Sequence, residues 1–367
     1  MQTFKKILFL LSYQERKRAG LLLIMSIIMA LLDMIGIVSI LPFISVLTNP
    51  SLIETNMILN NMFKITNFLG VQDYKQFLFV LGIFVFLLLI FSNAFKVLTS
   101  YVQIRFVYLR EYSIGKRLVE GYLRQPYSWF LSRNSADLGK TILSEVWQVV
   151  GNGMRPLIDL IAKGAIAISI ITLLIIVDPK LSIIVGLSLS CAYLLIFYFV
   201  RNYLNQTGEK RLINNELRFT IVNEAFGAAK EVKVGGLEEF YIKSFSNSAE
   251  AYAGTTASSQ VISQLPRYIL EAIAFGGILL IILYIMSRTG NFNNALPIIS
   301  LYVFASYRLI PALQQIYACL TQLTFIGPSL NKLHDDLKSL KQYNKDSNQA
   351  GLAFNDKIIL KYIHYAY

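Results

Sequence analysis

The sequence predicts an all-α polytopic membrane protein with six transmembrane helices, and two observations support this prediction. The 367 residues are 55% hydrophobic and 15% charged, whereas soluble domains carry about 25% charged residues. The apolar residues also gather in five or six runs that approach or exceed the roughly 20 residues needed to cross a bilayer. We place the spans at about residues 20–47, 76–100, 156–177, 181–203, 266–287 and 295–320.

Loop charge orients these spans. The N-terminal segment and the loop after the second span are rich in Lys and Arg, whereas the loops at residues 49–75, 178–180 and 288–294 carry few charges. Because short basic loops stay in the cytoplasm, we expect both termini to be cytoplasmic. The same rule accounts for the net charge of +12, so we expect no nucleic-acid partner. Cys191 and Cys319 suggest neither a disulfide framework nor a metal site.

The segments that flank the spans also have helical patterns. Phe4, Ile7, Leu8 and Leu11 lie at helical spacing, which indicates a short helix on the membrane surface or an extension of the first span. The two long cytoplasmic connections, residues 101–155 and 201–265, carry apolar residues at helical spacing with charged opposite faces. We therefore expect the spans to continue as helices well beyond the bilayer. Residues 341–352 have the composition of a linker, and a strand pattern occupies residues 353–367.

Six spans, long second and fourth connections, a linker and then a strand resemble the transmembrane domain of an ABC exporter. The stretch "LKYIHYAY", residues 360–367, is similar to the strand that opens the nucleotide-binding domain of that family. The resemblance implies that residues 1–340 form the transmembrane domain and residues 353–367 the start of a truncated nucleotide-binding domain. It also implies that Tyr367 stacks on the adenine of ATP in a complete domain, and that ATP and magnesium serve the complete transporter.

The sequence departs from the family in one large respect. It contains no G-x-x-x-x-G-K-[ST] segment and no L-S-G-G-Q segment. Without the glycine loop and its lysine, nothing cradles the β- and γ-phosphates. We expect this chain alone to bind no cofactor and to hydrolyse no ATP. A fragment of a longer product, a truncated reading frame and a motor on another polypeptide all remain open.

Two cytoplasmic stretches strengthen the resemblance. Residues 118–146 and 214–245 resemble the first and second cytoplasmic loops of the family. The resemblance implies that segments near residues 126–134 and 212–232 are coupling helices that dock on the nucleotide-binding domains, in the same chain or in a separate one. The alternative is that they pack against neighbouring helix ends. The candidate coupling residues are Tyr127, Trp129, Phe130, Glu224 and Phe226.

A narrower resemblance concerns the substrate. "LPRYILE", residues 265–271, and "SYRLIPALQQI", residues 306–316, look most like bacterial flippases of lipid-linked oligosaccharides and related polysaccharide exporters. This resemblance implies a lipid-linked substrate, a homodimer and a location among the lipids of the bacterial cytoplasmic membrane.

Arg308 is the sharpest candidate for the substrate cavity. It lies inside the sixth apolar run beside Tyr307, where an ionisable group is expensive unless it faces water, a partner charge or a ligand. It therefore either contacts an anionic substrate in the cavity or pairs with Asp33 or Glu271. A guanidinium suits a pyrophosphate because its fork makes two parallel charge-assisted hydrogen bonds.

Three further charged residues leave alternatives open. Arg267 and Glu271 share a helix face and form either a local salt bridge or part of the cavity. Asp33 is either a proton or ion site or a polar contact between helices. Besides an ATP-driven exporter, the sequence allows a membrane subunit with a separate ATPase chain, an ion-driven carrier that uses Asp33 and Arg308, or a membrane scaffold.

Overall fold

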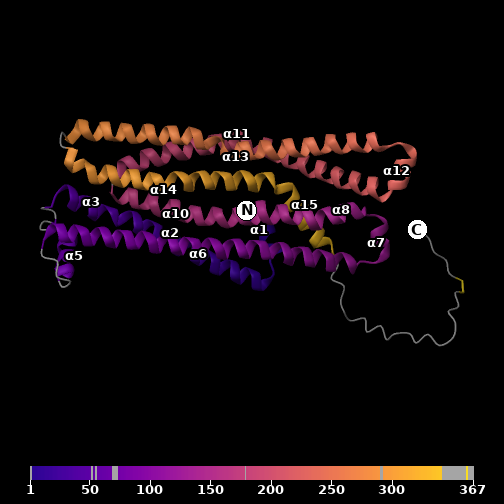
Figure 1. Ribbon diagram of the computed structural model, residues 1–367, viewed down its shortest axis with the longest axis horizontal. Helices are drawn as coiled ribbons and strands as arrows, with labels where there is room; N and C mark the ends of the chain where they lie inside the picture. Colours follow the sequence, from indigo (N-terminus) through magenta and orange to yellow (C-terminus); the bar gives the residue numbers. More distant parts are fainter. Residues whose placement is uncertain are drawn as a thin grey trace, which may run out of the picture.

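The computed structural model confirms the all-α fold class. It describes residues 2–50, 53, 56–67, 73–177, 179–289, 292–340 and 361–362. Helices form nearly all of this described part, and no strand occurs within it. The long helices run side by side along one axis and form an elongated bundle (Figure 1).

The first part of the chain contains one very long helix, α6, and several shorter ones. They are α1 (Gln2–Leu10), α2 (Tyr13–Val38), α3 (Ile40–Thr48), α5 (Met57–Asn67) and α6 (Tyr74–Leu123). Short elements then lead into the next long helix. They are α7 (Tyr127–Leu131), α8 (Ser135–Lys140), the π-helical turn η1 (Thr141–Glu145), α9 (Val146–Val149), a second π-helical turn η2 (Val150–Met154) and α10 (Arg155–Val177).

The second part of the chain contains two more very long helices. Its elements are α11 (Pro179–Gly227), α12 (Ala229–Gly235), α13 (Glu238–Thr289), α14 (Phe292–Phe325) and α15 (Gly327–Ser339). Helices α6, α11 and α13 have 50, 49 and 52 residues, so each is about 75 Å long at 1.5 Å per residue. A bilayer core is only about 30 Å thick, so these helices extend far beyond it, as the sequence predicts.

Several helical segments are long and apolar enough to cross a membrane. Three helical segments of the described residues qualify: Tyr13–Leu47, Tyr74–Leu123 and Ser135–Ile176. The pair Val303–Phe325 and Gly327–Ser339, bent by 53° at its break, qualifies when taken together. The predicted fourth and fifth spans lie within α11 and α13, where many side chains are outside the described part. The count of six spans therefore stays a prediction.

The first predicted span is broken, which the sequence analysis missed. Helix α2 ends at Val38, and α3 begins at Ile40, with Ser39 between them. Pro42 explains the break because its ring lacks an N–H and clashes with the carbonyl four residues earlier. In the first turn of a new helix the missing donor costs nothing, since N–H groups there have no intrahelical partner.

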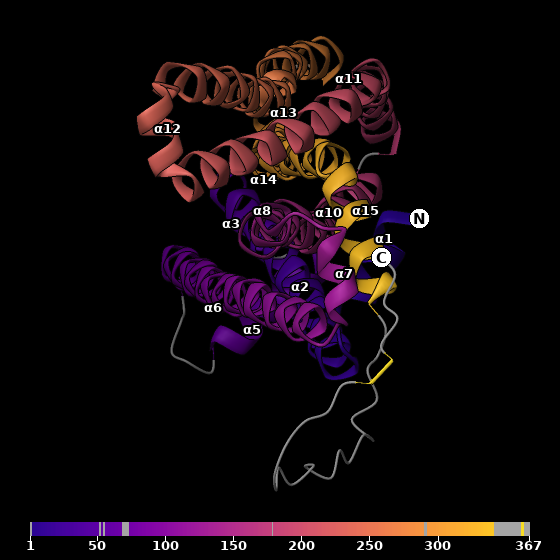
Figure 2. The ribbon, with the colours of Figure 1, turned by 90° about the vertical axis from the view of Figure 1, so that its right-hand side faces the viewer.

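The bundle has two layers joined by α14. Figure 2 shows α11, α12 and α13 on one side and α2, α6 and α10 on the other, with α14 packed between α10 and α13. One buried cluster joins α1, α6, α9 and α15 through residues that include Ile7, Leu10, Ile114, Val149 and Leu330. The helix α1 thus packs Ile7 and Leu10 against the protein, which leaves Phe4 exposed.

Several predicted features lie outside the described residues. They are the linker at residues 341–352 and the strand at residues 353–367, except for Lys361 and Tyr362, together with the adenine-stacking residue Tyr367. The domain boundary after residue 340 stays a prediction.

Candidate substrate cavity and coupling surface

A buried carboxylate joins three helices in the apolar half of the bundle. Asp33 of α2 is only 2% exposed, and its Oδ1 lies 2.8 Å from Nη1 of Arg308 on α14. From α6, Ser92 donates a hydrogen bond of 3.1 Å to the same oxygen, and Nζ of Lys96 lies 3.5 Å from Oδ2. Asp33 is therefore a contact between helices, and Arg308 has the partner that its depth requires.

Arg308 also faces a cavity. A space of about 310 Å³ lies between α2, α6 and α14, with Ile37, Leu89, Phe304, Tyr307 and Arg308 in its lining. The Arg308 side chain is 20% exposed although it is ion-paired. Tyr307 is 76% exposed. The structural pair of Arg308 with Asp33 is therefore present, and contact of Arg308 with an anionic substrate stays a prediction.

The predicted pair of Arg267 and Glu271 is only partly described. Arg267 is exposed on α13, one turn before Glu271, whose side chain lies outside the described residues. Neither the local salt bridge nor a place in the cavity is tested for this pair, and both stay predictions.

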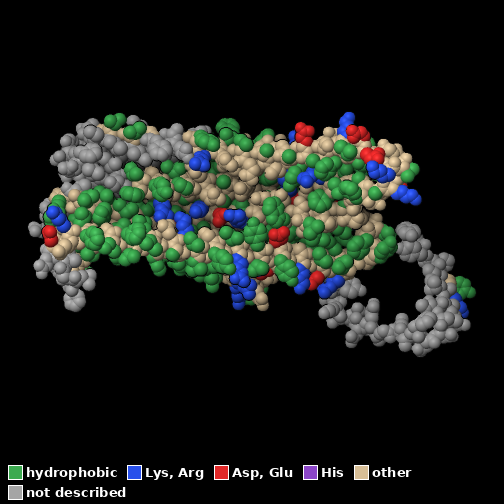
Figure 3. All heavy atoms as spheres, viewed as in Figure 1, with side chains coloured by type: hydrophobic (Ala, Val, Ile, Leu, Met, Phe, Trp, Pro, Cys, Tyr) green, Lys and Arg blue, Asp and Glu red, His purple; other side chains and the backbone are tan. Residues whose placement is uncertain are grey.

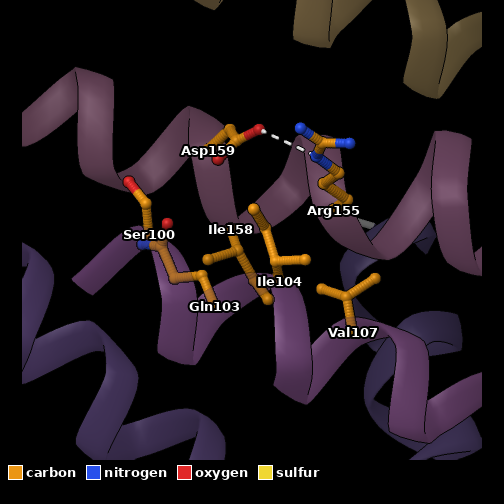
Figure 4. Close-up of a pocket in the computed structure, with 7 residues that line it drawn as sticks. All are labelled: Ser100, Gln103, Ile104, Val107, Arg155, Ile158 and Asp159. Atoms are coloured by element: carbon orange, nitrogen blue, oxygen red, sulfur yellow. Dashed lines mark ion pairs between the residues drawn. The ribbon is translucent and has the colours of Figure 1, made fainter. Parts of the chain in front are cut away.

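A second, smaller pocket lies between α6 and α10. Figure 4 shows Ser100 and Gln103 of α6 facing Arg155 and Asp159 of α10 across a space of about 70 Å³. Arg155 Nε lies 3.9 Å from Asp159 Oδ2, and Gln103 donates a hydrogen bond of 3.0 Å to Ser26 of α2. The Gln103–Ser26 hydrogen bond joins α6 to α2, whereas the Arg155–Asp159 pair lies within α10. The space has room for little more than water.

The predicted coupling segments lie at one end of the bundle, where the chain reverses at α7 and α12 (Figure 1). Tyr127, at the start of α7, is 76% exposed. Glu224 and Phe226 are exposed on the last turn of α11, and Phe226 is 79% exposed.

The structure adds two details to the coupling prediction, the extent of α11 and the packing of Trp129. The segment at residues 212–232 is not one coupling helix, because α11 runs unbroken to Gly227 and only α12 crosses the end. Trp129 packs inward, with its ring 5.4 Å from that of Tyr122 and the Arg133 guanidinium 4.7 Å above it. Its neighbour Phe130 is half-buried and lies edge-on to Trp129. Trp129 thus packs on Tyr122 of α6, and docking by Trp129 and Phe130 stays a prediction.

The sequence analysis missed a network of charged residues that joins α8, α11 and α15. Nζ of Lys140, fully buried on α8, lies 2.7 Å from Glu216 Oε2 on α11, and Lys332 of α15 lies 3.1 Å from the same oxygen. Nearby, Arg211 of α11 is ion-paired with Glu145 at 2.7 Å and donates a hydrogen bond to Ser329 of α15. Long sequence separation hides such partners, since the residues meet only when the helices pack.

No group of three or more His, Cys, Asp or Glu in the described residues is placed to hold a metal ion.

The long apolar helices of the described residues define a multi-pass membrane protein. A family model for the ABC transporter transmembrane region matches residues 19–309. The match covers most of the chain, which belongs to this family. Its role is transport across a membrane.

Proposed function

We propose that the chain is the membrane part of an ATP-driven exporter or flippase in the bacterial cytoplasmic membrane. It moves a lipid-linked oligosaccharide, or a similar amphipathic anion, by alternating access. Two copies surround one pathway, and both termini face the cytoplasm. Nucleotide-binding domains, in the same chain or in a separate subunit, supply ATP and magnesium. The family membership supports transport, and the residues of the chain support the finer points.

The position of Arg308 is the observation that favours an amphipathic anion as substrate. Its guanidinium lines an otherwise mainly apolar cavity while Asp33 holds one of its nitrogens. A guanidinium has five N–H donors, so donors remain for a phosphate or pyrophosphate. Asp33 fixes the orientation of the side chain, and charge-assisted bidentate bonds supply affinity. The apolar walls suit a lipid tail.

The exposed rings at the α7 and α12 end support coupling to an ATPase. Tyr127 and Phe226 are large, mostly exposed aromatic side chains of α7 and of the last turn of α11. These segments lie at the end of the bundle that α12 crosses (Figure 1). Aromatic residues are enriched at protein interfaces. A partner that closes on this end would move α6, α11 and α13, because these long helices connect it with the membrane part.

The test is lipid movement in vesicles that contain the complete transporter. We expect ATP-dependent movement of a lipid-linked pyrophosphate glycan by the unchanged protein. Arg308→Ala and Arg267→Ala should each reduce it at least tenfold while the protein remains in the membrane. Arg308→Lys should restore only part of the activity, since an ammonium lacks the planar fork. Arg201→Ala, an exposed arginine of α11, is the matched control and should leave transport unchanged.

Other outcomes assign the chain differently. Full activity of both the Arg308→Ala and Arg267→Ala variants would remove the cationic cavity. A requirement for a second polypeptide would favour a separate ATPase subunit. Movement driven by an ion gradient instead of ATP would favour a carrier, and no movement under any condition would favour a scaffold.

A further inference from the structure

A second groove lies between α2 and α6, away from the Arg308 cavity. It encloses about 210 Å³, and Arg18, Arg105 and Arg110 are part of its lining. On α2, Gly36 lines the Arg308 cavity and Arg18 lines this groove. Eighteen residues separate them, which corresponds to about 27 Å along a helix. The groove is a distinct site, and its interpretation does not depend on the proposed function.

The three arginines differ in how their charges are balanced. Arg110 is buried and forms an ion pair with Glu15 of α2. Arg18 and Arg105 are exposed. Arg105 is within hydrogen-bond distance of the Tyr101 hydroxyl, 3.4 Å away, and no carboxylate of the described residues is ion-paired with Arg18 or Arg105. The groove therefore carries two positive charges in excess.

The rest of the groove is apolar. Leu21, on the face of α2 that carries Arg18, is 58% exposed, and Val102 lines the groove from α6. The apolar stripe continues away from the arginines, with Ile28 exposed on α2 and Leu98 exposed on α6. The long apolar run of α2 begins directly after Arg18, so the arginines stand where a polar headgroup meets its acyl chains.

We propose that this groove binds an anionic phospholipid, with the headgroup phosphate between Arg18 and Arg105 and an acyl chain along Leu21 and Val102. Basic pockets between transmembrane helices favour anionic headgroups, and each arginine near such a charge strengthens binding roughly fivefold. A guanidinium pair also offers a phosphate several charge-assisted hydrogen bonds. The bound lipid would join α2 to α6 at their basic ends.

The experiment counts bound lipids by native mass spectrometry. The chain, purified in detergent, is titrated with phosphatidylglycerol or with phosphatidylcholine of the same acyl chains. We expect retention of phosphatidylglycerol and little phosphatidylcholine. The double variant Arg18→Gln with Arg105→Gln should weaken phosphatidylglycerol binding about thirtyfold. The double variant Arg201→Gln with Lys210→Gln, which removes two exposed charges from α11, should bind it as the unchanged protein does.

A third variant tests whether the lipid binds inside the groove or is held only by general attraction to positive charge. Val102→Trp keeps every charge but fills the apolar part, and we expect it to lose most of the bound lipid. Excess inorganic phosphate should not displace the lipid. Unchanged binding by Val102→Trp, equal loss in the α11 control, displacement by phosphate, or equal retention of both lipids by the unchanged protein would each overturn the proposal.

Discussion

Gly208 shows how one residue sets the distance between two helices. It lies on α11 where this helix meets the end of α14, and a Cβ atom at this position would collide with the backbone carbonyl of Phe325. A backbone oxygen in a helix cannot rotate away as a side chain can. The close approach also brings Pro328, at the start of α15, against α11. The bend between α14 and α15 is therefore packed tightly on α11.

The first prediction is that Gly208→Ala destabilises the protein. Overpacking costs about 1–3 kcal/mol when neighbours must shift, and here the neighbour is backbone, so we expect the upper part of this range. Thermal unfolding in detergent should show a lowered midpoint. Gly115→Ala on α6 is the control, since its added methyl group would meet no atom within 4 Å apart from its chain neighbours and the nearby backbone of α6 itself. It should be neutral or stabilising, and equal midpoints for the two variants would contradict the packing argument.

The contacts of Asp33 and Arg308 show which interactions of single residues could be predicted from the sequence. The depth of Arg308 in an apolar run was enough to predict a need for a partner, and Asp33 was one of the two candidates. Lys96 and Ser92, which also contact Asp33, were not predicted. Their contact depends on how α6 faces α2, and the apolar pattern of α6 leaves that rotation open because apolar residues cover most of its surface.

At the scale of elements, charges hold α8, α11 and α15 together. Glu216 of α11 accepts hydrogen bonds from Lys140 at 2.7 Å and from Lys332 at 3.1 Å. Burial acts to raise the pKa of Glu216, but the hydrogen bonds from Lys140 and Lys332 and the attraction of their positive charges together hold this pKa below its ordinary value. A carboxyl group with a lowered pKa in the folded state stabilises that state above its unfolded pKa, and the stabilisation is lost as the pH falls.

The second prediction follows from this sign. At neutral pH, ionised Glu216 should raise the unfolding midpoint of the unchanged protein. This contribution should decline as the pH falls below the ordinary glutamate pKa of 4.5. Glu216→Gln should lower the midpoint at neutral pH and reduce its acid dependence. Glu209→Gln, an exposed residue of the same helix, should change neither. An identical pH profile for Glu216→Gln and the unchanged protein would exclude the stabilising role.

Helices were predicted well where the length and composition of an apolar run determine their bounds. The predicted span at residues 156–177 matches α10 (Arg155–Val177) almost end to end, and the helical extensions of the cytoplasmic connections were expected. The break at Ser39 was missed although Pro42 signals it. The two π-helical turns before α10 have no comparable signal in the sequence, because an extra residue in a helical turn is chosen by packing.

At the scale of the whole molecule, the two ends of the bundle differ in surface chemistry. In Figure 3, hydrophobic side chains cover much of the exposed surface in the left part of the view, and Lys and Arg gather in the middle and right parts. The helices α7 and α12 lie at the right-hand end (Figure 1). Val234 of α12 and Leu131 of α7 are exposed apolar side chains at this end. If the basic part of the surface marks the membrane boundary, they lie outside the bilayer and do not contact lipid tails.

The last prediction tests whether this end receives a motor domain. Tyr127→Ala and Phe226→Ala each remove a ring that is mostly exposed, so we expect unchanged unfolding midpoints. A ring at the centre of an interface contributes about 2 kcal/mol or more, so each change should weaken docking of the ATPase about thirtyfold and uncouple ATP hydrolysis from lipid movement. Trp129→Ala is the contrasting variant and should lower the unfolding midpoint, because its ring packs on Tyr122. Full coupling in both the Tyr127→Ala and the Phe226→Ala variants would assign the docking surface elsewhere.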